Sequence, residues 1–67
     1  MQLTVNGTPR TLGPGVATLA ELVRELALEG KRIAVERNGE IVPRSRYAQT
    51  PIEDGDRLEI VGAVGGG

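Results

Sequence analysis

Alternating hydrophobic and polar residues open the chain and predict a short β-hairpin. Leu3 and Val5 alternate with polar neighbours, which is the period-2 pattern of a half-buried strand. The pair Asn6-Gly7 follows, and both residue types tolerate the positive φ of a tight hairpin turn. A return strand is expected near residues 9–12. Because Pro9 lacks a backbone N–H, this strand is expected at the edge of the sheet.

The spacing of the hydrophobic residues then changes to that of an amphipathic helix, which is expected to have about three turns. Thr18 and Glu21 have the spacing of a capping box, in which each side chain bonds the other residue's backbone amide. An apolar stripe follows at helical spacing and consists of Leu19, Leu22, Val23, Leu26 and Ala27. Gly30 is expected to end the segment in the left-handed conformation. Leu28 lies off the stripe and is expected to fold back under the core from the departing loop.

A second hairpin is predicted from the next alternation. Ile33 and Val35 alternate with Ala34 and Glu36, Asn38-Gly39 supplies another turn, and Ile41-Val42 forms the return strand. Pro43 stops that strand.

The last third of the chain predicts an irregular stretch and one closing strand. Tyr47, Ala48 and Ile52 are expected to plug the core from the irregular stretch between residues 44 and 52. After a turn at residues 54–56, the last strand is expected to face Leu58 and Ile60 inward and Arg57, Glu59 and Val61 outward. The predicted core is aliphatic and consists of Leu3, Val5, Leu12, Leu19, Leu22, Val23, Leu26, Ile33, Val35, Ile52, Leu58 and Ile60.

Two hairpins, one helix and a closing strand indicate an α+β protein. The closing strand can lie between the hairpins and run parallel to the first strand, which gives a five-stranded mixed sheet with one main helix packed on one face. This arrangement resembles the β-grasp, or ubiquitin-like, fold. We therefore expect a β-grasp domain over residues 1–62 and a flexible C-terminal tail over residues 63–67.

Composition narrows the function. The 67 residues contain no cysteine and no histidine, so the chain lacks a thiol nucleophile and the commonest general base and metal ligand. We therefore do not expect this chain to be an enzyme or to contain a metal site. The net charge of −1 and the single tyrosine argue against a nucleic-acid partner, and no apolar run approaches the length of a membrane span. A cytoplasmic location is expected.

The glycine run at the end of the chain is the candidate for chemistry. Gly65, Gly66 and Gly67 carry no side chains, so the distinctive group of this segment is the α-carboxylate of Gly67. Without Cβ atoms, Gly65 and Gly66 can pass through a narrow channel in a partner. The apolar residues Val61, Ala63 and Val64 are the expected anchors on that partner. The alternative is an inert tail or the remnant of a tag.

Several segments, taken in order, resemble one family. They are residues 34–44, Tyr47-Ala48, residues 54–61 and residues 63–67. Together they resemble the sulfur carrier proteins of thiazole biosynthesis (ThiS family). Where this family often has a larger residue, commonly histidine, the chain has Gly62, so the tail is expected to be mobile from residue 62 onward.

The resemblance implies a carrier that is a substrate and not a catalyst. An E1-like enzyme using MgATP would adenylate Gly67, and a cysteine persulfide would supply the sulfur of a thiocarboxylate. Thiazole synthase would use this thiocarboxylate as the sulfur source for the thiazole of thiamine. The carrier itself would bind no cofactor. The alternatives are a carrier for molybdopterin synthesis or tRNA thiolation, and a ubiquitin-like modifier or plain interaction domain.

Three other features are expected to have structural roles and not functional ones. The carboxylates of Glu53, Asp54 and Asp56 are expected to form a turn and not a metal site. Arg44 and Arg46 are expected to be solvated, and Tyr47 is expected to cover the core.

Overall fold

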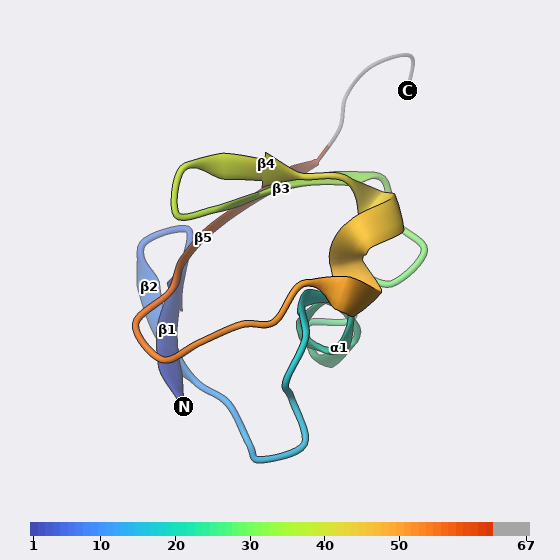
Figure 1. The fold of residues 1–67 in the computed structure, drawn as a ribbon. Coiled ribbons are helices and arrows are strands. Elements are labelled where there is room, and N and C mark those ends of the chain that lie inside the picture. Colours follow the sequence, from blue (N-terminus) through green and yellow to red (C-terminus); the bar gives the residue numbers. More distant parts are fainter. Residues whose placement is uncertain (63–67) are drawn as a thin grey trace.

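The computed structural model describes residues 1–62, and predictions about residues 63–67 lie outside this range. The order of elements is the one that the sequence predicts, with a 3-10 helix in the irregular stretch (Figure 1). The elements are β1 (Gln2–Val5), β2 (Thr8–Thr11), α1 (Leu19–Glu25), β3 (Ile33–Arg37), β4 (Glu40–Val42), η1 (Arg44–Gln49) and β5 (Arg57–Gly62).

The strands form one mixed sheet in the order β2-β1-β5-β3-β4. The closing strand β5 lies at the centre, parallel to β1 and antiparallel to β3. The sheet curls around α1, and η1 packs beside α1 on the same concave side (Figure 1). The predicted five-stranded mixed sheet with one main helix on one face is therefore confirmed.

Both predicted hairpin turns are present. Asn6 and Gly7 have φ of 52° and 79°, and Asn38 and Gly39 have φ of 53° and 89°. Positive φ at both central residues is the geometry that matches the twist of the flanking strands. β2, which contains Pro9, lies at the edge of the sheet as predicted.

The core lies between the concave face of the sheet, α1 and η1. Tyr47 is buried, as predicted, and burial raises the pKa of its hydroxyl. The prediction that Ala48 plugs the core is wrong, because η1 turns this residue to solvent. Leu26 and Ile33 are half-buried and pack against the core. The buried hydrophobic residues are Leu3, Val5, Leu12, Leu19, Leu22, Val23, Val35, Tyr47, Ile52, Leu58 and Ile60.

The capping box at the start of α1 is confirmed. The Glu21 amide donates to the Thr18 hydroxyl (3.3 Å), and the Glu21 carboxylate accepts from the Thr18 amide (3.0 Å). Hydrogen bonds from the backbone amides of Ala17 and Thr18 to this carboxylate lower the pKa of Glu21.

The predicted end of the helix is wrong. α1 has seven residues, about two turns, and the left-handed residue that ends it is Ala27, with φ of 61°. The Ala27 amide donates to the Arg24 carbonyl and the Leu28 amide to the Val23 carbonyl, which is the Schellman pattern. Gly30, also at positive φ, belongs to the next turn. The early end lets Leu28 fold back against the core, as expected.

Candidate functional site

The candidate site begins at the end of β5, the strand that leads to the glycine run. Val61 lies on the convex face of the sheet and is 57% exposed. Gly62 is the last residue of β5 and pairs with Ile33, so the sheet extends through the position from which mobility was expected. Ala63, Val64, Gly65, Gly66 and Gly67 lie outside the described residues, and their assigned roles stay predictions, as does the boundary between domain and tail.

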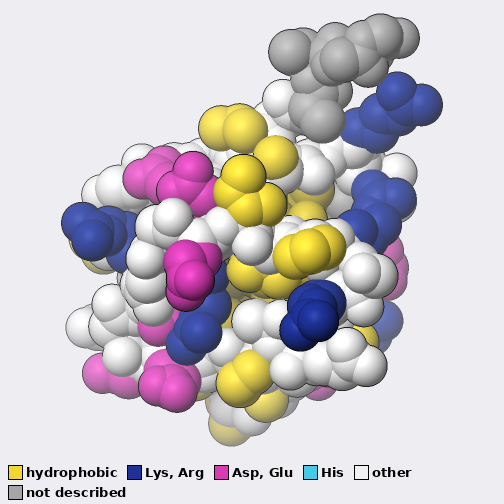
Figure 2. Space-filling view, turned by 45° about the horizontal axis from the view of Figure 1, so that its top comes forward, with side chains coloured by type: hydrophobic (Ala, Val, Ile, Leu, Met, Phe, Trp, Pro, Cys, Tyr) yellow, Lys and Arg dark blue, Asp and Glu magenta, His cyan; other side chains and the backbone are white. Residues whose placement is uncertain are grey.

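An apolar patch lies on the convex face of the sheet, around Val61. We define the outer patch as Ala34, Ile41 and Val61, which line a shallow hollow of about 80 Å³ together with the carboxylate residues Glu36 and Glu59. Ala34 pairs with Val61 across β3 and β5, and Ile41 lies opposite Glu36. Figure 2 shows hydrophobic side chains on the upper part of the molecule with acidic side chains beside them.

Ile41 was missed as a site residue. It is 72% exposed, the highest value among the large hydrophobic residues of the described part. The sequence pattern contains a signal for it, since Val42 points to the core and its neighbour must then point outward. Exposed apolar side chains that adjoin one another are typical of binding surfaces.

Gly62 leaves the concave face of the sheet uncovered at the end of β5, because it has no side chain. Register places it on the face that carries Ile33 and Ile60, and a Cβ built at this position would have no atom within 4 Å. A larger residue, which the family resemblance leads one to expect here, would therefore fit. Its absence leaves space beside the end of β5.

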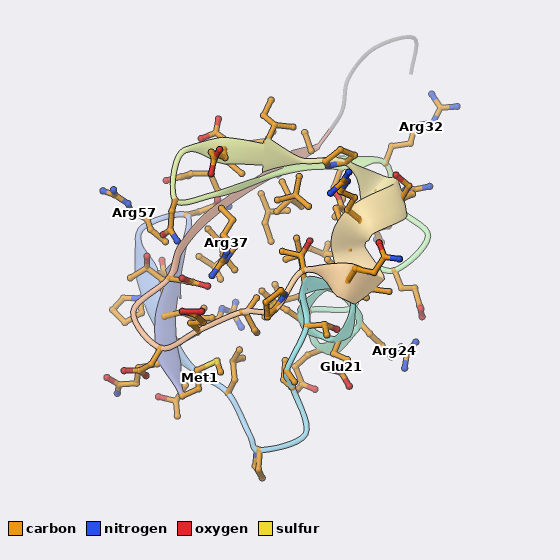
Figure 3. All side chains as sticks on the ribbon, in the orientation of Figure 1. Met1, Glu21, Arg24, Arg32, Arg37 and Arg57 are labelled. Atoms are coloured by element: carbon orange, nitrogen blue, oxygen red, sulfur yellow. The ribbon has the colours of Figure 1, made fainter. Side chains whose placement is uncertain are left out.

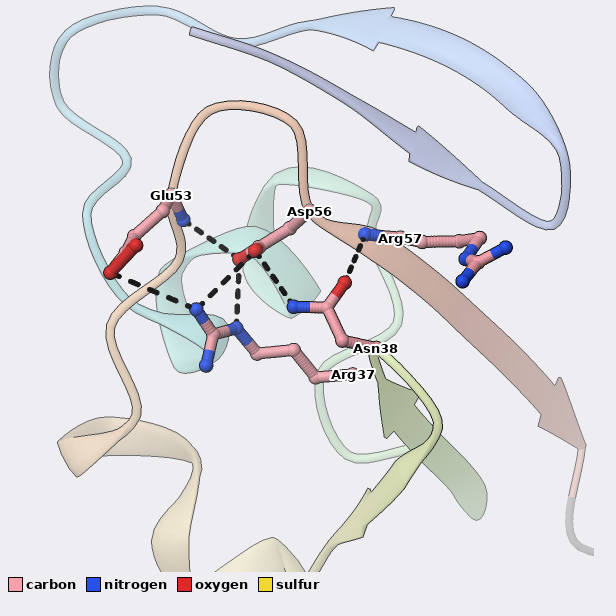
Figure 4. A network of polar contacts seen from close by, with 5 residues as sticks. All are labelled: Arg37, Asn38, Glu53, Asp56 and Arg57. Atoms are coloured by element: carbon pink, nitrogen blue, oxygen red, sulfur yellow. Dashed lines mark hydrogen bonds and ion pairs between the residues drawn. The ribbon is translucent and has the colours of Figure 1, made fainter.

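The beginning of β5 is fixed by a buried ion pair (Figure 4). Asp56, whose side chain is 7% exposed, accepts from Arg37 Nε (2.7 Å), from Asn38 Nδ2 (3.0 Å) and from the Glu53 amide (2.8 Å). Burial alone would raise the pKa of Asp56, but these donors outweigh it and hold the pKa below its usual value. The network therefore stabilises the ionised carboxylate.

The turn that holds Asp56 also contains the other two carboxylate residues of this cluster, Glu53 and Asp54. The turn predicted for residues 54–56 is confirmed, with Gly55 at φ 88° and Asp54 accepting from the Gln2 amide. Within residues 1–62 no group of acidic residues is arranged to hold a metal ion. No pattern in the sequence indicates that Asp56 would be buried beside Arg37.

The far part of β5 is held by a side chain. β1 pairs with β5 only as far as Leu58, and beyond that point Asn6 takes over. The Asn6 amide group donates to the Ile60 carbonyl (2.9 Å) and accepts from the Ile60 amide (2.7 Å). Asn38 contributes one such bond at the near end, where its Oδ1 accepts from the Arg57 amide. Both hairpin asparagines therefore fix the strand that leads to the glycine run.

Basic residues also lie near the end of β5, in addition to the acidic Glu36 and Glu59 of the outer patch. Arg32 lies close to the end of β5 and far from Arg57 (Figure 3). Arg44, which was expected to be solvated, donates to the Lys31 carbonyl (2.6 Å) and ties η1 to the loop before β3.

Comparison with known proteins assigns the chain and its fold to a family. The ThiS family model matches residues 3–67. The chain is 36% identical to a crystal structure of a thiamine biosynthesis protein (ThiS) from Geobacter metallireducens, with a TM-score of 0.85 and full coverage of both chains. It is 38% identical over 65 residues to the sulfur carrier protein ThiS of Bacillus subtilis, covering 97% of this chain and 98% of that protein. The chain belongs to the ThiS family, and the β-grasp prediction is confirmed.

Two further relatives are larger proteins. The chain is 48% identical over all 67 residues to a thiazole synthase of Paramagnetospirillum magneticum and 34% identical to one of Magnetococcus marinus. It spans about a fifth of the length of each.

The helices of residues 1–62 are too short and too polar to cross a bilayer.

Proposed function

We propose that the chain is a sulfur carrier of thiamine biosynthesis. The observation that carries this proposal is its match along almost the whole length of the Bacillus subtilis sulfur carrier ThiS. The matched family region runs through the glycine run to Gly67. A cytoplasmic location, where its partners would meet it, is part of the proposal.

The proposed chemistry takes place on the Gly67 carboxylate. A terminal carboxyl has a pKa of about 3.3, so it is ionised near neutral pH and resists nucleophiles. An E1-like enzyme with MgATP would convert it to an acyl-adenylate. The outer sulfur of a cysteine persulfide would then attack the acyl carbon and release AMP, and a thiol would cleave the resulting acyl disulfide to give the thiocarboxylate and a new disulfide. The chain has no cysteine or histidine to perform these steps, which supports its role as the substrate of other enzymes.

The proposed acceptor is a thiazole synthase. Two relatives contain a segment similar to this chain within a protein named thiazole synthase, which supports a close working association between the two activities. Gly65 and Gly66 would pass through the partner's channel, while Val61, Ala63 and Val64 would hold the carrier in place.

We assign the outer patch to the activating enzyme. Its apolar centre is flanked by Glu36 and Glu59, so it suits a partner surface with an apolar centre and basic margins. Such a surface would hold the domain while the tail enters the site of adenylation.

Intact mass measurement tests the carrier function. After incubation with the activating enzyme, MgATP, a persulfide donor and a thiol reductant, the chain is expected to exchange one oxygen for sulfur. Removal of Gly66 and Gly67 should abolish the exchange and leave thermal unfolding unchanged, since two glycines remove no side chain from the protein. An unmodified mass for the full chain, or thiazole formation in cells that have only the truncated chain, would contradict the proposal.

A further inference from the structure

A second surface lies at the end of β5, mostly on the opposite side of the sheet from the outer patch, with which it shares Val61. We define the concave groove as the hollow of about 440 Å³ lined by Val5, Asn6, Arg10, Leu26, Leu28, Lys31, Ile33, Ile60, Val61 and Gly62. It exists because α1 ends at Glu25 and because Gly62 contributes no side chain to the concave face.

The floor of the groove is apolar and only partly covered. Leu26, Leu28 and Ile33 pack against the core but remain half-buried, so each has surface that the domain itself does not cover. A partner side chain placed there would remove further apolar area from water. The floor therefore favours an aliphatic or aromatic side chain as its occupant.

The rim of the groove is basic. Arg10 reaches it from β2 and Lys31 from the loop before β3, and both residues are exposed. Within residues 1–62, neither residue forms an ion pair; those present join Arg24 to Glu29 and Arg37 to Glu53 and Asp56. Their charges are available to carboxylates on a partner.

We propose that the concave groove docks a segment of thiazole synthase that carries an apolar side chain flanked by carboxylates. The inference rests on the proposed function. A carrier with one tail serves two enzymes, and the two surfaces beside β5 differ in charge: the outer patch has acidic margins and the groove has basic ones. Opposite charges allow each partner to be recognised by its own surface.

Two variants test the groove directly. Gly62→Leu should fill it without strain, because a Cβ at this position meets no neighbour within 4 Å. The double variant Arg10→Glu with Lys31→Glu reverses the charge of the rim from basic to acidic. The matched control, Arg46→Glu with Arg57→Glu, has the same net charge and changes no residue of the groove. Circular dichroism checks that each variant is folded.

Binding to purified thiazole synthase is measured by calorimetry, and thiocarboxylate formation by intact mass. Both groove variants are expected to bind thiazole synthase about tenfold more weakly than the control variant, a difference typical of losing one good anchor. Their thiocarboxylation is expected to stay within about twofold of the control, because the outer patch is intact. Higher salt should weaken wild-type binding more than that of the rim variant.

The possible failures are distinguishable. Absence of thiocarboxylate on the wild-type chain contradicts the proposed function itself. Thiocarboxylation of the wild type with unchanged synthase binding by both groove variants overturns only the groove. Slower thiocarboxylation without weaker synthase binding would assign the groove to the activating enzyme and also overturn the proposal. The proposal would also be overturned if the carrier alone formed a dimer and Gly62→Leu dissociated it. The occupant of the groove would then be a second copy of the chain.

Discussion

Three non-glycine residues of the described part hold the left-handed backbone conformation: Asn6, Ala27 and Asn38. Asparagine tolerates this conformation, and both asparagines use their side chains to bond β5. Ala27 has no such compensation. Its Cβ opposes a conformation that the end of α1 requires, so the chain gives up stability at this position.

Replacing Ala27 with glycine is therefore expected to stabilise the protein. The gain should be about 1 kcal/mol in the free energy of unfolding, because glycine removes the Cβ conflict at the helix end. Ala20→Gly, in the first turn of the same helix, is the control and should lose up to about 1 kcal/mol. Urea unfolding of the two variants measures both effects. A loss of stability in Ala27→Gly would show that the left-handed position is not strained.

The side chain of Asn6 predicts a local effect on the end of β5. Asn6→Gly keeps the turn conformation but removes two hydrogen bonds to Ile60, so we expect a loss of about 1–2 kcal/mol. Amide hydrogen exchange should become faster at Ile60, while the Val35 amide, in the same sheet, serves as the internal control. Equal protection of Ile60 in both proteins would contradict a role for Asn6 in holding this strand.

At the scale of elements, Asp56 joins the turn before β5 to the end of β3. Replacing Asp56 with asparagine leaves Arg37 only the more distant carboxylate of Glu53 (4.0 Å), and losing the charge-assisted bonds to Asp56 is expected to cost about 2 kcal/mol. Urea unfolding near neutral pH measures this loss. The control is Glu59→Gln, at an exposed position, which should change stability by less than about 0.5 kcal/mol.

The same carboxylate predicts how stability depends on pH. Because the folded pKa of Asp56 lies below its unfolded value, near 3.9, its contribution is complete above that value and is lost as pH falls through the folded pKa. Wild-type stability should therefore decrease from about pH 4 downward, and Asp56→Asn should show a shallower decrease. Parallel curves for the two proteins in acid would contradict this assignment.

The comparison of sequence and structure separates local signals from long-range ones. The capping box of Thr18, the Asn-Gly turns and the inward positions of β5 depend on residues that adjoin one another, and they were predicted correctly. Arg37 and Asp56 are 19 positions apart in the sequence, so no local pattern could predict that they form a pair. The early end of α1 was missed because alanine favours helices, and only tertiary packing of Leu28 makes the left-handed turn at Ala27 favourable.

For the candidate site, the same distinction applies. The outward direction of Val61 follows from alternation along its strand, and the structure confirms it. Its neighbours Ala34 and Ile41 come from other strands, and only the sheet order β5-β3-β4 brings them together. Gly65 to Gly67 remain a prediction from sequence and family, because the chemistry assigned to them requires partner enzymes.

At the scale of the whole molecule, the outer patch can be altered without disturbing the core. Ile41 and Val61 are largely exposed, so Ile41→Ser with Val61→Ser is expected to change the free energy of unfolding by less than about 1 kcal/mol. Removing two apolar anchors from an interface should nevertheless weaken binding to the activating enzyme by about tenfold or more. Thiocarboxylation at limiting carrier concentration measures this effect. Met1→Ser, which removes an exposed apolar side chain outside the patch, is the control. If the double variant were thiocarboxylated as fast as the control at every carrier concentration, the activating enzyme would have to recognise the carrier through its tail alone.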